Sequence, residues 1–240
     1  MFQAKQALFA VAISSLLAFS FSALGQTSSA DLVASALDHG DRPSGDAADD
    51  ARRMPLEVLA FAGIEAGVTI LELEAGTGYY TEILSRTVGP NGNVIMQNPP
   101  AFDGIFGEAV EQRLAENRLS NVNLSRTNFD ELSATDNSVD MVTWILGPHE
   151  LWFQPGENVS LGNPEESFEE IYRVLKPGGV FLAVDHIAED SAGTEVGGTL
   201  HRIGEGIVRD MAEAAGLNVL RVSNLHKNED DPLNNSVFDP

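Results

Sequence analysis

Two groups of residues in this sequence have side chains or backbone properties suited to chemistry, and both follow apolar runs typical of buried strands. In the first group, Gly76 and Gly78 alternate in a turn after the apolar residues 68–71, which the acidic Glu72 follows. Glycines in such a turn let the backbone approach a ligand and direct helix N–H groups toward it. The second group is His149 and His186, whose imidazoles titrate near neutral pH. The sequence therefore predicts a ligand-binding turn with proton-transfer groups nearby.

The glycine turn lies inside a predicted βαβ unit. Residues 68–71 are β-branched and apolar, residues 79–88 have the character of a helix that Gly89-Pro90-Asn91-Gly92 ends, and residues 93–97 form a second short strand. The first β-to-α turn is where doubly wound folds bind nucleotides. Two glycines alone are weak evidence, because a tight turn without a ligand also needs them.

The spacing of the glycines separates two nucleotide-binding classes. The nicotinamide pattern G-x-G-x-x-G would place a third glycine at position 81, which is Thr81. The stretch instead resembles motif I of class I S-adenosylmethionine-dependent methyltransferases, with Glu72, Gly76 and Gly78 matching. Glu74 departs from the motif, because it replaces the first glycine.

Further stretches make this resemblance specific, and together they cover roughly residues 56–222. They are residues 128–132, residues 136–140, and residues 170–180, which contain Lys176-Pro177-Gly178-Gly179. The chain is most similar to exported predicted methyltransferases, which share Leu-Ala-Phe-Ala-Gly, Gly-Tyr-Tyr-Thr-Glu, Asp-His and Leu-His-Arg-Ile. Here these are residues 59–63, 78–82, 185–186 and 200–203. The resemblance implies an S-adenosylmethionine-dependent methyltransferase with an unidentified acceptor.

The resemblance also implies which residues contact the cofactor. Gln97 and Asn98 stand where an acid usually holds the ribose hydroxyls, and Asn128 stands where an Asp usually contacts the adenine amino group. Glu74 would lie near the methionine moiety, attracting its ammonium and sulfonium but repelling its carboxylate. The predicted cofactor-binding residues are Glu72, Glu74, Gly76, Thr77, Gly78, Gln97, Asn98, Asn128 and Phe129.

Two histidines are the predicted catalytic bases. His149 and His186 follow the fourth and fifth predicted strands, at the carboxyl ends where doubly wound sheets bind ligands. For each histidine alone, a structural role is an equally good interpretation. His201, at the head of a helix, is predicted to be structural. A metal site formed by His149, Asp185, His186 and His201 is an alternative, but no close-spaced pattern of ligands supports it, so no metal site is predicted.

The elements around these residues alternate strand and helix. Strands are expected at residues 68–71, 93–97, 121–125, 138–146 and 180–184. Helices are expected at residues 49–61 with a kink or helix start near Pro55, at 79–88, 108–118, 165–175 with Asn163 as the cap, and 200–215, with at most one short helix before them at 31–37. This alternation predicts an α/β fold with a doubly wound, Rossmann-like, mostly parallel sheet. Six strands are expected, the last at residues 217–222, with no seventh strand. We divide the chain into a signal peptide at 1–25, a flexible leader at 26–45, a methyltransferase-like domain at 46–225 and an irregular tail at 226–240.

The amino-terminal residues and the overall charge suggest where the protein acts. Lys5 is followed by an apolar run broken by serines and then by Ala23-Leu24-Gly25, which is typical of a cleaved secretory signal rather than a membrane anchor. We therefore expect export, to the periplasm, and no stable membrane insertion after cleavage. The formal net charge is −22, which disfavours nucleic acid as a partner. The absence of cysteine excludes disulfides and thiolate metal sites.

Three functions remain open from the sequence. The first is methyl transfer from S-adenosylmethionine to a small molecule or protein. The second is a non-catalytic binding protein on the same fold, which the weakened ribose and methionine contacts favour. A nicotinamide oxidoreductase is third, because Thr81 and the missing acid after the second strand disfavour it.

Overall fold

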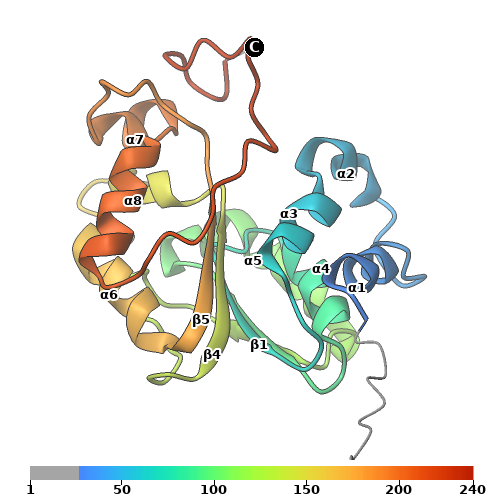
Figure 1. The fold of residues 1–240 in the computed structure, drawn as a ribbon. Helices are drawn as coiled ribbons and strands as arrows, with labels where there is room; N and C mark the ends of the chain where they lie inside the picture. The colour runs from blue at the N-terminus through green and yellow to red at the C-terminus, as the bar shows by residue number, and fades with distance from the viewer. Residues whose placement is uncertain (1–26, 240) are drawn as a thin grey trace, which may run out of the picture.

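The computed structural model describes residues 27–239, and its centre is a five-stranded sheet in which every paired strand is parallel (Figure 1). The strand order is β3-β2-β1-β4-β5. The chain thus builds the sheet from β1 outward to β3 and then returns to add β4 and β5 on the other side of β1. This confirms the predicted Rossmann-like α/β fold. The strands are β1 Thr69–Leu73, β2 Asn93–Gln97, β3 Val122–Ser125, β4 Val139–Ile145 and β5 Leu175–Val184.

Helices cover both faces of the sheet. The α-helices are α1 Ser29–Leu37, α2 Ala47–Arg53, α3 Pro55–Ala62, α4 Tyr79–Val88, α5 Asp103–Leu114, α6 Pro164–Val174, α7 Glu195–Leu200 and α8 Glu205–Ala214. Short 3-10 helices are η1 Pro100–Phe102, η2 Ala115–Asn117 and η3 Pro148–Trp152. None of the helices between residues 27 and 239 combines the length and the apolar character needed to cross a bilayer.

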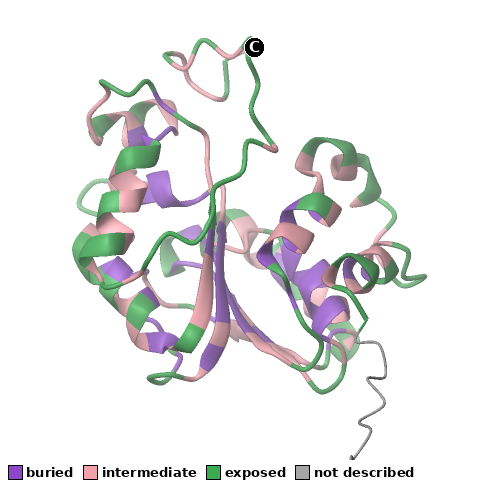
Figure 2. Ribbon diagram, in the orientation of Figure 1, coloured by how far each residue is buried: buried purple, intermediate pink, exposed green. Residues whose placement is uncertain are grey.

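The alternation of side chains along β1 separates two hydrophobic cores. Ile70 points into the core that α1, α3 and α4 cover, whereas Leu71 and Leu73 point into the core that α6 and α8 cover. In Figure 2 the buried residues follow the sheet and the helix faces turned toward it, while α8 is largely exposed on its outer side. Because both faces are covered, β1 and β4 are apolar over most of their length, as the sequence predicted.

The region predicted as a flexible leader contains a helix that belongs to the core. Ser28 caps α1 by accepting a hydrogen bond from the Asp31 N–H, and Val33 and Ala36 are buried against α3 and α4. A short helix at residues 31–37 was predicted, and α1 confirms it; the correction is that this helix packs in the core and does not belong to a mobile leader. The predicted signal peptide lies outside the described residues.

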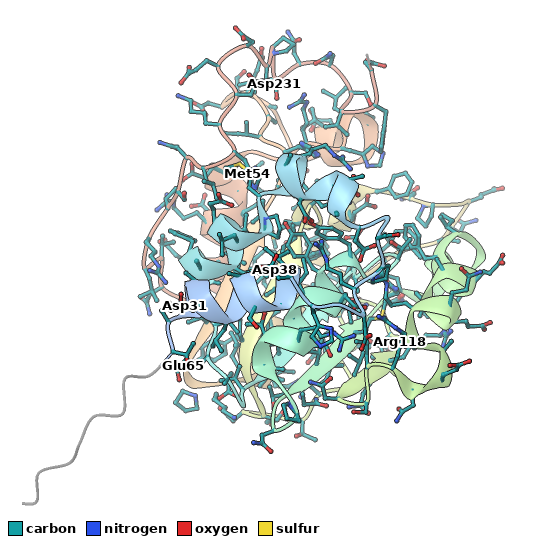
Figure 3. The ribbon with its side chains drawn as sticks, turned by 90° about the vertical axis from the view of Figure 1, so that its right-hand side faces the viewer. Asp31, Asp38, Met54, Glu65, Arg118 and Asp231 are labelled. Atoms are coloured by element: carbon teal, nitrogen blue, oxygen red, sulfur yellow. The ribbon has the colours of Figure 1, made fainter. Side chains whose placement is uncertain are left out.

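Several element boundaries also differ from the prediction. One helix expected over residues 49–61 is divided at Met54, labelled in Figure 3, whose left-handed φ of 45° precedes Pro55 at the first position of α3. A helix expected over residues 200–215 is divided at His201, which has φ 53°. The helix expected at residues 108–118 is α5, which begins earlier, at Asp103. The cap of α6 is as predicted, with the Asn163 side chain accepting from the Glu166 N–H.

The sixth predicted strand is not formed. Residues 217–222 have no regular structure within the described part of the chain, and Val219, Leu220 and Val222 are exposed. Their alternating apolar pattern is typical of a strand, but they do not pair with β5. A strand needs a partner for its backbone groups as well as a suitable pattern, so the prediction of six strands was wrong. Residues 226–239 form no strand either.

Candidate active site at the carboxyl end of the sheet

The glycine turn joins β1 to α4 through backbone conformations that L-residues rarely adopt. Glu74, Gly76 and Gly78 have φ values of 51°, 57° and 84°. The left-handed conformation explains why related sequences have a glycine at the first of these positions. Here Glu74 adopts it despite the cost of about 1–2 kcal/mol for a residue with a Cβ atom. Strain of this kind persists where the surroundings fix the chain, and it often marks a functional site.

Two amide side chains from the end of β2 fix the turn. Gln97 accepts from the Glu74 N–H at 2.9 Å and donates to the Thr127 carbonyl at 2.6 Å. Asn98 accepts from the Gly76 N–H at 2.8 Å and donates to the Gly76 carbonyl at 3.0 Å. Both side chains are buried. Their hydrogen bonds are directed to the backbone, which argues against the predicted role as ribose contacts and assigns them the positioning of the turn.

The two glycines face different surroundings. A Cβ atom on Gly76 would meet no atom within 4 Å, whereas one on Gly78 would lie 3.0 Å from Arg113 Cγ and 3.1 Å from Met96 Cε. Gly76 is therefore the position where a ligand can approach the backbone. Gly78 is required instead by its φ value and by the side chain of Arg113, which donates to the Thr77 carbonyl at 3.2 Å. Thr77 itself is exposed on the turn.

Glu72 is a buried carboxyl at the end of β1. Burial raises its pKa to about 8, although the hydrogen bond from the Thr81 hydroxyl to Oε2, at 2.5 Å, acts in the opposite direction. Thr81, which replaces the third glycine of the nicotinamide motif, thus serves to hold Glu72. A carboxyl in this state is neutral or easily protonated at pH 7 until a cation comes next to it.

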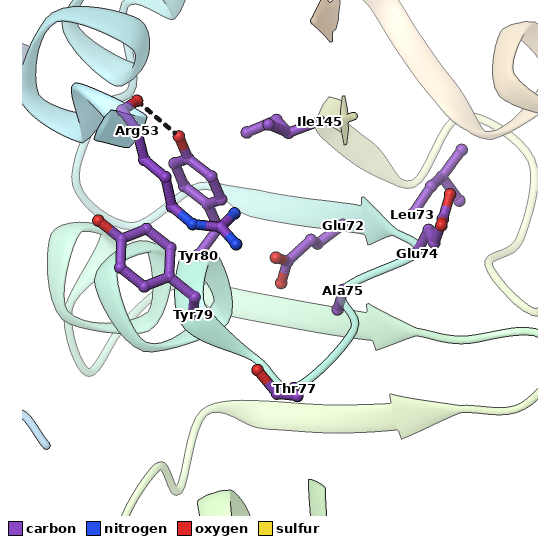
Figure 4. Close-up of a pocket in the computed structure, with 9 residues that line it drawn as sticks. All are labelled: Arg53, Glu72, Leu73, Glu74, Ala75, Thr77, Tyr79, Tyr80 and Ile145. Atoms are coloured by element: carbon purple, nitrogen blue, oxygen red, sulfur yellow. Dashed lines mark hydrogen bonds between the residues drawn. The ribbon is translucent and has the colours of Figure 1, made fainter. Parts of the chain in front are cut away.

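A small cavity opens where β1, α2 and α4 meet, and Figure 4 shows its lining. Arg53 enters from α2 and Glu72 from β1, while Glu74 lines the far end with its carboxyl directed away from Arg53. The Arg53 guanidinium lies 4.7 Å from the centre of the Tyr79 ring, and the Tyr80 hydroxyl donates to the Arg53 carbonyl at 3.1 Å. Arg53 Nε is buried and has no hydrogen-bond partner among the described residues.

The chemistry of this lining fits the methionine end of S-adenosylmethionine. Glu72 and Glu74 provide carboxylates for an ammonium and a sulfonium, and Arg53 provides an unused N–H for a carboxylate. The cavity measures about 70 Å³, whereas pockets for molecules of this size usually measure about 300–1,000 Å³. A part of the lining must therefore move before such a molecule binds. The candidate is α2, which has no buried residue.

Of the two predicted adenine contacts, Asn128 has an available side chain and Phe129 does not. Asn128 is half-buried, and its side chain makes no hydrogen bond to any described residue, so its carbonyl is available. Phe129 is fully buried, its ring lies 4.6 Å from that of Trp144, and its N–H donates to the Leu161 carbonyl at 2.9 Å. The side chain of Phe129 therefore belongs to the core beneath the site.

Glu74 connects the turn to a second group of polar residues. The Trp144 indole N–H donates to Glu74 Oε2 at 3.1 Å, and a Cβ atom on Gly147 would lie only 2.6 Å from this oxygen. Burial and, next, the Glu150 carboxylate raise the pKa of Glu74, while His149 lowers it. Glu74 thus lies between the cavity at the end of β1 and the loop after β4.

His149 lies in that loop with both ring nitrogens engaged. Its Nδ1 is 2.7 Å from Asp185 Oδ1, and its backbone N–H donates to Asp185 Oδ2 at 2.8 Å. Burial opposes its charged form, but hydrogen bonds with Asp185 and Glu150 outweigh burial and raise the pKa to about 10. Because both ring nitrogens of His149 have partners in the folded protein, His149 is less suited than a free imidazole to the predicted role of general base.

The other two histidines, His186 and His201, lie in different surroundings. The His186 ring makes no hydrogen bond within the described residues, and burial lowers its pKa, so it is neutral at pH 7 and can accept a proton. His201 Nδ1 lies 3.2 Å from both His149 Nε2 and Glu150 Oε1. Although 52 residues separate His201 from His149 in the chain, the loop after β4 and the turn after α7 bring them together.

Comparison with known sequences identifies the family. A sequence model of the ubiE/COQ5 methyltransferase family matches residues 55–192, which include the turn, the loop after β4 and the cavity lining except Arg53. The chain belongs to the ubiE/COQ5 methyltransferase family. This membership confirms the predicted class I methyltransferase resemblance and S-adenosylmethionine as the cofactor of the family.

Individual relatives agree with this assignment. The chain is 31% identical over 127 residues to the ubiquinone/menaquinone biosynthesis C-methyltransferase UbiE of Hydrogenovibrio crunogenus, covering 53% of this chain and 45% of that protein. The match thus spans about half of the curated relative's length. A crystal structure of a SAM-dependent methyltransferase from Aquifex aeolicus superposes with a TM-score of 0.58 at 24% identity, over 72% of this chain and 85% of that one.

A further structural neighbour was solved with the cofactor bound. Phosphoethanolamine N-methyltransferase 2 of Haemonchus contortus, in complex with S-adenosyl-L-methionine, superposes with a TM-score of 0.53 at 17% identity, over 67% of this chain and 36% of that chain. At such identities these structures establish the shared fold only. The family assignment rests on the sequence match.

Arg53, Trp144 and Glu150 are site residues of this ubiE/COQ5 family member that the sequence did not single out. Arg53 lies on a short helix without an apolar stripe, and Trp144 has the character of a core residue in a strand. Glu150 directly follows His149 in the predicted loop, so the adjacency of an acid and a histidine was the one available signal. The Glu150 carboxylate contacts His201, which is distant in the chain, so the sequence alone does not show that these two residues meet.

Proposed function

We propose that this chain transfers a methyl group from S-adenosylmethionine to an acceptor bound beside the loops that follow β4 and β5. The observation that carries the proposal is the cavity at the end of β1. There Arg53, whose Nε makes no hydrogen bond and has Asp49 Oδ2 as an ionic neighbour at 3.5 Å, points toward Glu72, with Glu74 at the end of the strand and the open turn at Gly76 beside them. This arrangement matches the charges of an amino acid carrying a sulfonium.

The residues of this site bind and orient rather than react. When bound, S-adenosylmethionine supplies an activated methyl group on a sulfonium, so the protein needs mainly to align the acceptor. Arg53 pairs with the carboxylate, and Glu72 pairs with the ammonium, which keeps Glu72 ionised despite its burial. Glu74, held by the Trp144 indole, lies nearest to the loop that would hold the acceptor.

The acceptor is a small molecule or a protein. The name of the Hydrogenovibrio relative specifies C-methylation in quinone biosynthesis, and methylation at carbon requires removal of a proton. Of the two predicted bases, His186 has the free ring for this step, because both ring nitrogens of His149 contact other side chains. We therefore assign the role of base to His186.

Calorimetric titration with S-adenosylmethionine, S-adenosylhomocysteine and NAD tests this proposal. The first two should bind with a stoichiometry of one, and NAD should not bind. Methyl transfer to a panel of acceptors follows, in which His186→Gln should lower the rate by about 10²–10⁴-fold without changing cofactor affinity. The exposed His226 provides the matched control variant, His226→Gln. An absence of S-adenosylmethionine binding would refute the proposal.

A second function is a non-catalytic binding protein on the same fold. The observation that favours it is the use of Gln97 and Asn98 to hold the turn, which leaves no side chain from the end of β2 for the ribose. This function predicts cofactor binding without turnover on any acceptor, so the same pair of measurements distinguishes the two.

We propose further that the protein is exported, to the periplasm, and has neither a nucleic-acid partner nor a stable membrane insertion. The support is the charge and apolar pattern around Lys5, the small residues Ala23-Leu24-Gly25, and the net charge of −22. Mass spectrometry of the native protein should find Gln26 at or near the amino terminus. Met1 or Phe2 at the terminus would contradict export by cleavage.

A further inference from the structure

Three donor atoms at the carboxyl end of the sheet form a triangle of nearly equal sides. His149 Nε2, His201 Nδ1 and Glu150 Oε1 lie 3.2 Å apart along each side. Three ligands placed about 2.0 Å from a tetrahedral zinc ion are separated by about 3.3 Å. The triangle therefore has the dimensions of three corners of a zinc tetrahedron.

Hydrogen bonds alone do not satisfy this triangle. The two imidazole N–H groups can both donate to Glu150 Oε1, but the contact of 3.2 Å between the two nitrogens then has no hydrogen between its atoms. The second carboxylate oxygen, Glu150 Oε2, is buried and has no partner among residues 27–239, and only 10% of the Glu150 side chain is exposed. A cation at the centre of the triangle would satisfy all three donors at once.

The residues around the triangle have the character of a supporting shell. Asp185 lies 2.7 Å from His149 Nδ1, which directs Nε2 toward the triangle, as carboxylates do behind metal-binding histidines. The rings of Phe153, which is half-buried, and Phe238, which is exposed, each lie 4.9 Å from the His201 ring. His201 and Leu146 both have left-handed φ values, 53° and 63°, so the backbone on both sides is held in conformations that cost free energy.

We infer that His149, Glu150 and His201 bind a divalent transition-metal ion of the zinc class, with Asp185 as the positioning residue. Two imidazoles and one carboxylate leave a fourth coordination position open, as in zinc sites that bind a further ligand. The inference does not rest on the proposed methyl transfer, because metal binding is measured without S-adenosylmethionine.

Equilibrium dialysis of the chelator-treated full chain against Zn²⁺, in excess Mg²⁺ to occupy the acidic surface, tests the inference. One Zn²⁺ should remain per chain, and Co²⁺ should give the visible absorption of a tetrahedral site. His201→Ala and Glu150→Gln should each weaken Zn²⁺ binding at least about 100-fold. Asp185→Asn should weaken it about 10–100-fold, the usual effect of losing the group behind a metal-bound histidine.

The exposed His226 supplies the matched control, since His226→Ala removes an imidazole from the described surface and should leave Zn²⁺ binding unchanged. Retention of no Zn²⁺ by the wild-type chain, or a wild-type Co²⁺ spectrum typical of octahedral surface binding, would overturn the inference. Equal Zn²⁺ affinity in His201→Ala, folded by circular dichroism, would do the same.

Discussion

At the scale of single residues, one five-residue motif accounts for much of the site. In residues 78–82, Gly78 provides the left-handed turn, and Tyr79 and Tyr80 hold α2 through the Asp50 carboxylate and the Arg53 carbonyl. The last two residues of the motif make contacts inside the fold. Thr81 donates to Glu72, and Glu82, which is fully buried, pairs with Arg86 and Arg118. The motif was visible in the sequence, but these roles depend on partners up to 36 residues away.

The buried carboxyl of Glu72 predicts a specific dependence of stability on pH. Its folded pKa is about 8 and its ordinary value is 4.5, so between these values the folded state binds a proton that the unfolded chain releases. The free energy of unfolding therefore falls as pH rises from about 4.5 to about 8, by up to about 1.4 kcal/mol per unit. Glu72→Gln, which stays neutral and can still accept from Thr81, should remove this part of the slope.

Urea unfolding at pH 5, 6, 7 and 8 measures the slope. The exposed Glu57 provides the control variant, Glu57→Gln, which should retain the wild-type slope. If Glu72→Gln and the wild-type chain show the same pH dependence, Glu72 is already ionised in the folded protein and the cavity is more polar than described here.

At the scale of elements, the strands were predicted well and the helices near the site were not. The strand positions follow from apolar runs that the parallel sheet requires, so β1, β2 and β4 were evident. The break between α2 and α3 was anticipated at Pro55. The end of α7 at His201 was not, because the left-handed residue there is a histidine and the predicted helix ran past Gly204, which precedes α8. This end of α7 is what brings His201 next to His149, so the cluster could not be predicted from the sequence pattern.

Helix α2 should behave as the mobile cover of the cavity. It has no buried residue, and the cavity beneath it is too small for a nucleoside cofactor. Elements with few buried contacts open at low free energy, so α2 amides should exchange rapidly in the free protein and become protected when S-adenosylhomocysteine binds.

Hydrogen–deuterium exchange with mass spectrometry measures this effect. Helix α3, whose Val58 and Leu59 are in the core, serves as the internal control and should change little. Protection confined to α5, or an α2 already as protected as α3 in the free protein, would place the moving cover elsewhere.

At the scale of the whole molecule, the excess of negative charge sets a background for every local interaction. The chain has 36 acidic and 14 basic residues, and much of the positive charge is paired within the fold, as in Arg113 with Asp46 and Arg202 with Asp231. Composition predicts the sign and size of the net charge, but only the fold shows that the acidic groups near the cavity lie at the edge where three strands end.

Repulsion among these charges should make the protein more stable in salt. Raising NaCl from 20 to 500 mM shortens the range of the repulsion. If about 1 kcal/mol is relieved, the melting temperature rises about 2–4 °C for a chain of this size. Differential scanning fluorimetry measures the shift, with sucrose of equal osmolality as the uncharged control. A melting temperature that falls in NaCl would mean that the internal ion pairs outweigh the repulsion.

The central claim is that the cavity beneath α2 binds the methionine end of S-adenosylmethionine through Arg53. The neighbouring arginine offers a matched control: Arg52 lies on the same helix and pairs with the same Asp49, but its side chain is 71% exposed, against 26% for Arg53.

Calorimetric titration of S-adenosylmethionine into Arg53→Met and Arg52→Met tests the claim most directly. Loss of a charged hydrogen bond should weaken binding about 10–100-fold in Arg53→Met, with Arg52→Met close to the wild-type affinity. Equal affinities in the two variants, both folded by circular dichroism, would contradict the claim and place the cofactor outside this cavity.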